Sequence, residues 1–451
     1  MKLWQNKTNL NKTVEIFETK DDLVLDNQIA IFDVAATIAH GKMLAKMGIL
    51  SKQEFESAHN GLLAIAQLIK EQKFNLEMGD EDIHTKIENY LTQHVGEVGK
   101  KIHTGRSRND QVLTALRLLE KQKIFEIWQQ AILLTELFLE FAEKYKTIPM
   151  PGYTHMQKAM PYSVGAWAVS FVSGLLDSLE VLEKSLEVID QSPLGSAAGF
   201  GAPLKIDKNY TAKLLGFKNV QINSLSCQNS RGKLEAIILA DCIALLTDVN
   251  KFASDILFFT TNECNFFTVD ATVTTGSSIM PQKKNVDLAE LLRSKIHVVL
   301  GNYLTCATLS TNVISGFNRD LQDSKRPVIE GLQTTIDSLA ATQILLSSIT
   351  PKEKELTKAI TPEMLAAHKA VELTQKGVAF RDAYHQVATH LQEIKPKKAK
   401  FYLKHNTNLG DTGNLQIHNF KEKLNIVKQI LEQKSSYFET SLENLLQKGG
   451  E

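Results

Sequence analysis

Residues 233–275 read KLEAIILADCIALLTDVNKFASDILFFTTNECNFFTVDATVTT and contain neither glycine nor proline. Because these two residues are the strongest breakers of regular structure, more than 40 residues without them predict a long helix. At 1.5 Å per residue, a continuous helix of this size would be about 60 Å long. Apolar residues recur along it mostly at helical spacing: Leu234, Ile237, Ile238, Ala240, Ile243, Leu245 and Leu246.

A second rod is predicted over residues 106–150, where Pro149 is the one breaker. Its first apolar stripe is Val112, Leu116, Leu119, Ile127, Ala131, Leu134, Phe138 and Phe141, and its second is Leu113, Leu118, Phe125, Trp128, Ile132 and Leu139. A helix that is apolar on two faces must be covered on both. One chain struggles to cover several such rods, so we expect a helical bundle shared between subunits. No alternating strand series interrupts this pattern, and the predicted fold class is all-α.

The length of 451 residues exceeds the roughly 250–300 residues at which a single core stops growing. We therefore expect three helical domains. Residues 1–105 would form shorter helices, and residues 106–350 would hold the long rods. Residues 351–451 would form a third domain, because Pro351 and Pro362 mark a break before further short helices.

Composition excludes several classes of function. The 51 basic and 51 acidic residues balance, so no overall field recruits nucleic acid or an anionic membrane. No run of about 18 uncharged apolar residues is present, and we expect no membrane span. The start of the chain lacks the apolar core of a signal peptide. The cysteines form no paired motif, which favours reduced thiols in a cytoplasmic protein: Cys227, Cys242, Cys264 and Cys306.

The most informative motif is GSSIMPQKKN, residues 276–285, between two predicted helices. An exposed polar loop is the simplest alternative, but the string fits the signature G-S-S-x-M-P-x-K-x-N and so resembles the fumarase/aspartase superfamily. The resemblance implies that Ser277 is the catalytic base and that Lys283 and Asn285 bind a substrate carboxylate. Removing a proton α to a carboxylate builds a dianionic transition state, which preorganised cations and donors stabilise. The surrounding positive charge would lower the high pKa of the serine.

A second motif, TGRSRNDQ at residues 104–111, lies where the first long rod begins. A plain helix start with a solvated charge cluster is the alternative. Arginine matches carboxylates bidentately, and a helix N-terminus favours anions. The string is typical of argininosuccinate lyases within the superfamily, whereas fumarases and adenylosuccinate lyases differ here. The resemblance implies that Arg108 and Asn109 contact the substrate.

The third motif, GYTHMQKAMP at residues 152–161, resembles the family's G-Y-T-H-x-Q-x-A-x-P. A lone histidine is more often structural, but the flanking match favours a role in catalysis. By resemblance, His155 assists proton transfer at the leaving nitrogen and Thr154 contacts a carboxylate. A carboxylate usually orients such a histidine. Glu290 matches the family's partner position and would come from another subunit.

Two further segments carry the resemblance. NRDLQDSK, residues 318–325, places Gln322 and Lys325 near the amino-acid end of the substrate. DEDIH, residues 80–84, resembles the family's E-D-I-H segment, and His84 is either structural or a support of the site. The family resemblance also implies a homotetramer in which three subunits build each active site, with no metal or organic cofactor.

The chain departs from the family pattern at several positions. Phe317 stands where tyrosine is common, so one substrate hydrogen bond is lost or replaced. Asp22 falls where a substrate-contacting serine is usual, and Val286 replaces a proline. The segments 195–201 and 230–233 also differ. These changes lie at the substrate periphery and leave room for an altered amino-acid end.

The resemblance predicts an argininosuccinate lyase, which cleaves argininosuccinate to arginine and fumarate by β-elimination in arginine biosynthesis. Another fumarate-releasing lyase of the same superfamily, with a changed amino-acid end, is a second hypothesis. A non-catalytic protein on the same scaffold is a third, but Ser277, His155 and Lys283 are all present.

Overall fold

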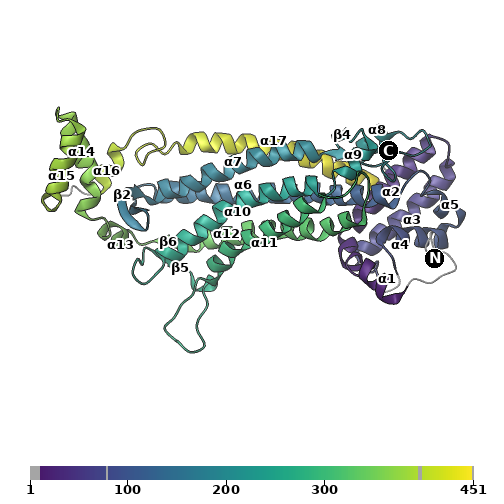
Figure 1. Ribbon diagram of the computed structural model, residues 1–451, viewed down its shortest axis with the longest axis horizontal. Helices are drawn as coiled ribbons and strands as arrows, with labels where there is room; N and C mark the ends of the chain where they lie inside the picture. The colour runs from purple at the N-terminus through teal and green to yellow at the C-terminus, as the bar shows by residue number, and fades with distance from the viewer. Residues whose placement is uncertain (1–10, 78–79, 395–398, 449–451) are drawn as a thin grey trace.

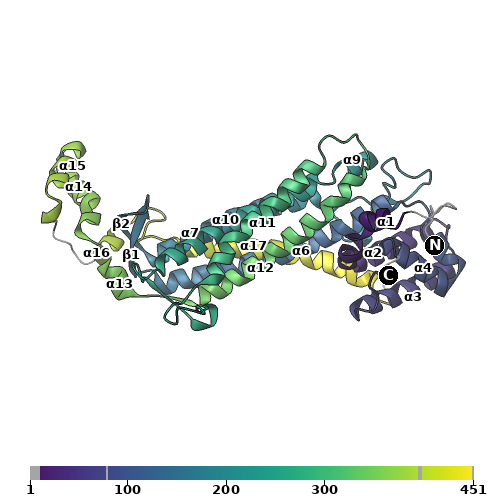
Figure 2. The same cartoon turned by 60° about the horizontal axis from the view of Figure 1, so that its bottom comes forward.

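The computed structural model describes residues 11–77, 80–394 and 399–448. A bundle of long helices lies along the long axis, and the remaining helices, most of them shorter, gather at both ends (Figures 1 and 2). The helices of the bundle are α6 (Arg108–Tyr145), α7 (Val164–Ile189), α10 (Lys233–Phe259), α11 (Asp287–Leu309), α12 (Lys325–Ser347) and α17 (Ile417–Leu445). At one end lie α1 (Lys12–Thr19), α2 (Asp22–Lys46), α3 (Lys52–Lys70), α4 (Ile83–Val95), α5 (Glu97–Lys101), α8 (Lys208–Leu214) and α9 (Ser224–Asn229). At the opposite end lie α13 (Glu353–Lys358), α14 (Ala366–Gln375), α15 (Phe380–Thr389) and α16 (Ala399–His405).

The all-α prediction is confirmed, although short strands join some of the helices. They form two-stranded sheets: antiparallel β1 (Pro149–Thr154) with β2 (Gln157–Ser163), parallel β3 (Gln191–Ser192) with β4 (Asn219–Val220), and antiparallel β5 (Phe267–Val269) with β6 (Ile349–Pro351). None of these sheets forms a layer of the core. The hydrophobic core lies between the long helices instead.

The rod predicted over residues 106–150 is α6, a helix of 38 residues. Both of its apolar stripes are buried apart from Val112, which is half-buried. Segments of the same chain therefore cover both faces of this helix, and the sharing of the bundle between subunits stays a prediction. Helices α2, α7, α12 and α17 of the same chain pack around it. Periodicity indicates that two faces are covered, but it does not indicate which segment covers them.

The second rod is shorter than predicted, since α10 ends at Phe259 and the predicted helix over residues 260–275 is absent. The hydroxyl of Thr260 donates to the Ile256 carbonyl at 2.6 Å, and the Asn265 amide donates to the Thr261 carbonyl at 2.8 Å. Asn265 has φ 50°, a conformation that asparagine tolerates better than most residues. The helix therefore ends without glycine or proline, in a turn that backbone hydrogen bonds and the left-handed conformation of Asn265 define.

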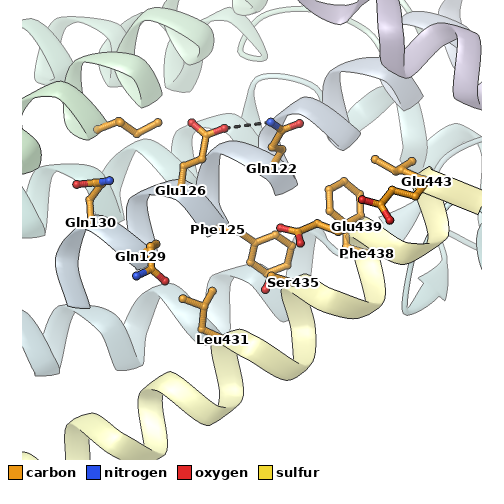
Figure 3. Close-up of a pocket in the computed structure, with 12 residues that line it drawn as sticks. Gln122, Phe125, Glu126, Gln129, Gln130, Leu431, Ser435, Phe438, Glu439 and Glu443 are labelled. Carbon is orange, nitrogen blue, oxygen red and sulfur yellow. Dashed lines mark hydrogen bonds between the residues drawn. The ribbon is translucent and has the colours of Figure 1, made fainter. Parts of the chain in front are cut away.

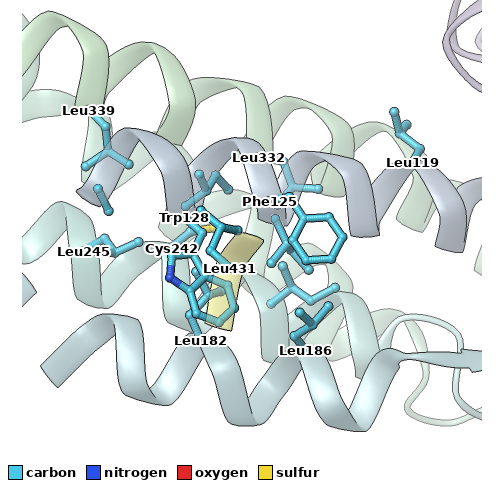
Figure 4. Close-up of a cluster of buried hydrophobic side chains, with 14 of the residues drawn as sticks. Leu119, Phe125, Trp128, Leu182, Leu186, Cys242, Leu245, Leu332, Leu339 and Leu431 are labelled. Carbon is cyan, nitrogen blue, oxygen red and sulfur yellow. The ribbon is translucent and has the colours of Figure 1, made fainter. Parts of the chain in front are cut away.

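The centre of the core is a layer to which five helices contribute. Trp128 of α6 is 1% exposed and lies with Leu182 of α7, Cys242 of α10 and Leu431 of α17 (Figure 4). Leu339 of α12 borders the same cluster. A large aromatic side chain in such a position contributes strongly to stability, because its removal leaves a cavity that the neighbouring helices cannot fill.

Residues after Pro351 form short helices, as predicted, until α17, which has 29 residues. This helix returns along the bundle and packs against α6 and α7. Phe438 contacts Phe125 with ring centroids 5.8 Å apart, and Lys434 pairs with Glu183 at 3.0 Å. The division into three domains stays a prediction. Its boundary at residue 351 assigns α17 to the third domain, although α17 packs against α6 and α7 of the second.

Two helices, α2 and α7, are long and apolar enough to cross a membrane by length and composition alone. However, 72% and 67% of their most apolar windows are buried within the fold, which is typical of core helices. By contrast, α11 exposes a row of large apolar side chains. Leu291, Val298 and Leu304 are 57%, 47% and 53% exposed, respectively.

Candidate active site

The start of α6 is held by a capping box that positions Arg108 and Asn109. The backbone amide of Asn109 donates to the Ser107 hydroxyl at 3.3 Å, and the backbone amide of Ser107 donates to the Asp110 carboxylate at 2.9 Å. These bonds satisfy donors that the first helical turn otherwise leaves unpaired. The cap therefore fixes where the helix begins and where both predicted substrate-binding residues lie.

Asp110 also anchors the segment 195–201 to this helix start. Its second carboxylate oxygen accepts the backbone amides of Gly195 and Ala197, both at 3.0 Å. Burial raises the pKa of Asp110 above its ordinary value, although these amide bonds oppose the shift. Gly195 has φ 91°, and a Cβ there would lie 2.6 Å from the Ile206 side chain, so this position requires glycine.

Arg108 is oriented by the segment that leads into α4. Its guanidinium lies 2.5 Å from the Glu81 carboxylate and 3.4 Å from that of Asp82, and it donates to the Thr85 hydroxyl at 2.7 Å. The side chain is about one quarter exposed. The arginine is therefore preorganised, but acidic neighbours already balance part of its charge.

Gln322 and Lys325 reach the same region from the 3₁₀ turn η2 (Arg319–Ser324) and the start of α12. Both contact Asp22 of α2: Lys325 Nζ lies 2.7 Å from Asp22 Oδ1, and Gln322 Nε2 donates to Oδ2 at 3.1 Å. Lys325 also pairs with Asp26. Burial alone lowers the pKa of Lys325, but the carboxylates of Asp26 and Asp22 outweigh it, so that pKa rises above its ordinary value. Lys325 is therefore a permanent cation at neutral pH.

His84 lies beneath these residues. Its Nδ1 is 3.0 Å from the Asp33 carboxylate, and both side chains are almost fully buried. Burial alone lowers the pKa of His84, but Asp33 outweighs it and raises that pKa to about 9. A buried, charged histidine paired with a carboxylate fits the role of supporting the site better than that of exchanging protons near neutral pH.

These residues line one cavity of about 150 Å³, which we call the Arg108 cavity. It brings together four of the predicted substrate-binding residues: Arg108, Asn109, Gln322 and Lys325. Its other walls are Thr19, Asp22, Asp26, Glu81, Asp82, His84, Val112, Arg231, Phe317 and Arg319. Charged groups of both signs dominate this lining, which suits a polar substrate with several charges.

A larger groove of about 490 Å³ lies between α6 and α17 and contains none of the predicted residues (Figure 3). Phe125 and Phe438 form its floor, and Gln122 donates to Glu126 at its edge. Size alone therefore does not identify the active site.

His155 and Thr154 lie on the β1–β2 hairpin, far along the bundle from the Arg108 cavity (Figures 1 and 2). Thr154 pairs with Gln157, so His155 and Met156 form a two-residue turn. Both have positive φ, 52° and 61°, as a type I′ turn requires. Residues other than glycine are strained there, and such strain often marks a functional site. The hairpin holds His155 out into solvent.

Ser277, Lys283 and Asn285 lie on a loop that leaves the side of the bundle (Figure 1). The backbones of Thr275 and Asn285 exchange hydrogen bonds of 3.0 and 2.9 Å, which close the base of the loop. The Ser277 hydroxyl accepts the Met280 amide at 3.1 Å. Ser277 is half-buried and Lys283 is exposed.

Glu290 lies in the first turn of α11 and is exposed. Among the residues that the structure describes, no hydrogen bond or ion pair joins Glu290 to His155, or either of them to the loop at Ser277 or to the Arg108 cavity. One chain therefore assembles the predicted residues in separate places rather than in one site.

Several cavity residues had no assigned role in the sequence prediction. Asp26 follows Asp22 by one helical turn, a spacing that places both carboxylates on the same face of α2. Arg231 and Asp22 differ from the family pattern, and this difference is the sequence feature that points to them as cavity residues. In the described residues, 11–77, 80–394 and 399–448, no three His, Cys, Asp or Glu side chains gather as a metal site.

Comparisons with known proteins agree with the motifs. The family model described as Lyase matches residues 7–301. An argininosuccinate lyase from Thermotoga neapolitana is 42% identical over 387 residues, covering 86% of this chain and 97% of that protein. An argininosuccinate lyase from Sorangium cellulosum is 38% identical over 424 residues, which cover 94% of this chain and 98% of that protein. EDDS lyase in complex with formate has a similar fold, with a TM-score of 0.80 at 19% identity over 98% of this chain and 95% of that chain. The chain belongs to the argininosuccinate lyase family.

Proposed function

We propose that this protein cleaves argininosuccinate to arginine and fumarate. The observation that carries the proposal is the Arg108 cavity, where Arg108, Asn109, Gln322 and Lys325 meet although they come from distant parts of the chain. Curated relatives named argininosuccinate lyase, which match nearly their whole length, support the same activity. The reaction is a step of arginine biosynthesis, and we place it in the cytoplasm.

The proposed chemistry is a β-elimination that begins at Ser277. The serine oxygen takes a proton from the succinyl carbon next to a carboxylate, and the electron pair of that C–H bond forms the new double bond. Lys283 and Asn285 bind this carboxylate while negative charge builds on it. Fixed cations and amide donors stabilise such a transition state more than they stabilise the ground state.

At the other end of the breaking bond, the guanidino nitrogen leaves with the C–N electron pair. His155, which Glu290 orients, delivers a proton to that nitrogen and so releases arginine. Arg108, Asn109 and Thr154 hold the substrate carboxylates. The residues assigned to these steps need no metal or organic cofactor.

The separation of these residues in one chain supports a site shared between chains. The hairpin at His155 and the loop at Ser277 both project into solvent, where another subunit is able to meet them. The exposed apolar row on α11, which includes Leu291 and Val298, supports close packing of several copies. We therefore propose a homotetramer in which each site draws on three chains.

The direct test supplies argininosuccinate and follows the ultraviolet absorbance of fumarate. Ser277→Ala should abolish turnover while gel filtration still shows the tetramer. Ser278→Ala is the matched control, because it removes a neighbouring hydroxyl of the same loop and should leave most activity. Turnover by Ser277→Ala at the wild-type rate contradicts the assignment of the base.

A second candidate is a fumarate-releasing lyase with another amino-acid end. The contact of Asp22 with both Gln322 and Lys325 favours it, because a carboxylate occupies the donors assigned to that end. Rates on argininosuccinate, adenylosuccinate, aspartate and malate decide between the two. A faster reaction with any of the last three overturns the first candidate.

A further inference from the structure

Arg231 is a wall of the Arg108 cavity with unused hydrogen-bond donors. The side chain is 2% exposed, and its Nε and Nη1 atoms have no hydrogen-bond partner among the residues that the structure describes. Its Nη2 donates a long bond, 3.5 Å, to the Leu321 carbonyl. A buried guanidinium with unpaired donors is costly unless a ligand completes it.

Phe317 is the aromatic neighbour of these donors. Its ring lies beside the guanidinium of Arg231, with the central carbon 4.9 Å from the ring centroid. Such a contact is attractive for a cation, but the phenyl ring has no hydroxyl group to bind the donors or the substrate.

The donors of Lys325 and Gln322 are already engaged. Lys325 pairs with Asp22 and Asp26, and Gln322 donates to Asp22 and to the Glu18 carbonyl. Two carboxylates around one ammonium leave this corner with a net negative charge. Such a corner attracts a cationic group of the substrate, whereas an incoming carboxylate finds its donors on Arg231.

We infer that Arg231 and Asp22 together recognise the zwitterionic α-amino-acid end of the substrate, with Arg231 binding its carboxylate and Asp22 binding its ammonium group. This inference rests on the proposed function and adds two residues that set its specificity. The two charges fit one ligand because both residues line the same small cavity. Burial lowers the pKa of Arg231, and the nearby carboxylates of Glu235 and, to a smaller extent, Asp22 oppose that shift.

A structural role for Arg231 is the competing explanation, since the buried carboxylates Glu235 and Glu120 also lie close to it. The two explanations differ in what they predict for ligands. A structural arginine affects every ligand alike, whereas a specificity residue affects only ligands that carry the group it binds.

The test measures inhibition of argininosuccinate cleavage by three compounds: arginine, agmatine, which lacks the α-carboxylate, and 5-guanidinopentanoate, which lacks the α-ammonium group. In Arg231→Lys the inhibition constant of arginine should rise about tenfold or more, and that of agmatine should stay nearly constant. In Asp22→Asn the inhibition constant of arginine should rise by a similar factor, whereas that of 5-guanidinopentanoate should stay nearly constant. Inhibition by fumarate should not change in either variant, because it binds at the other end.

Asp21→Asn is the matched control, because Asp21 is a half-buried neighbour that pairs with Arg326 outside the cavity. The inhibition constants of all three compounds for the Asp21→Asn variant should match those for the wild type. Equal weakening of arginine and agmatine in Arg231→Lys overturns the inference and assigns a structural role, as do unchanged constants in both variants. A wild-type protein that does not cleave argininosuccinate overturns the proposed function, and the inference falls with it.

Discussion

Chains that carry Ser277→Ala and chains that carry His155→Asn, each inactive alone, should regain activity when they are assembled together. In one chain, Ser277 lies on the loop before α11 and His155 lies on the β1–β2 hairpin, and no contact joins them among the described residues. If each active site takes these two residues from different chains, a mixed assembly contains some sites with both residues intact.

The size of the recovery follows from counting chains. In an equal mixture that assembles at random, half of the chains that supply the serine retain it, and half of those that supply the histidine retain it. About one quarter of the sites are then complete. The expected activity is therefore about 25% of the wild-type value per site, and slightly more once assemblies of a single variant are removed.

The assay co-expresses the two variants with different affinity tags, purifies assemblies that carry both tags, and measures fumarate release. The control pairs Ser277→Ala with Asn285→Ala. Thr275 and Asn285 close one loop, so both of these residues come from the same chain and every loop is defective. Recovery in the control, or none in the first mixture, refutes a site shared in this way.

Three further predictions concern stability. His84 has a pKa of about 9, above its unfolded value near 6.5, so its pairing stabilises the fold by on the order of 3 kcal/mol below pH 6.5 and loses that effect as the pH rises through 9. The gap in unfolding free energy between wild type and His84→Ala should therefore narrow over that range, and a constant gap contradicts the charged pair. Trp128→Ala should cost about 3–5 kcal/mol in denaturant unfolding, and a cost below about 1 kcal/mol contradicts its place in the core. Met156→Gly should raise the melting temperature slightly, because glycine adopts the positive φ at the hairpin tip without strain. A melting temperature below that of the wild type argues against that strain.

Local features of the site followed directly from the sequence. TGRSRNDQ marked the start of α6, and the structure places Ser107 and Asp110 as its capping box. The breaker-free stretch before Pro149 gave the helix its length. The pattern of breakers does not predict where α10 ends, because the turn at Asn265 contains neither glycine nor proline.

The family motifs predict residues for each part of the proposed reaction, but not how those residues meet. The ion pair of Asp22 with Lys325 joins positions 303 residues apart, and sequence spacing carries no information about such a contact. The same is true of Arg231, because only the folded structure shows that its buried donors face the cavity without a described partner.

The sequence by itself determined the helical class, the rod that became α6 and the chemistry-bearing side chains, because period, breakers and motif residues are local properties. Only the tertiary structure decided that α17 covers α6, that an acidic corner surrounds Lys325, and that the serine loop and the histidine hairpin lie apart. Packing between distant segments depends on three-dimensional shape and charge, which a linear pattern of residues does not record.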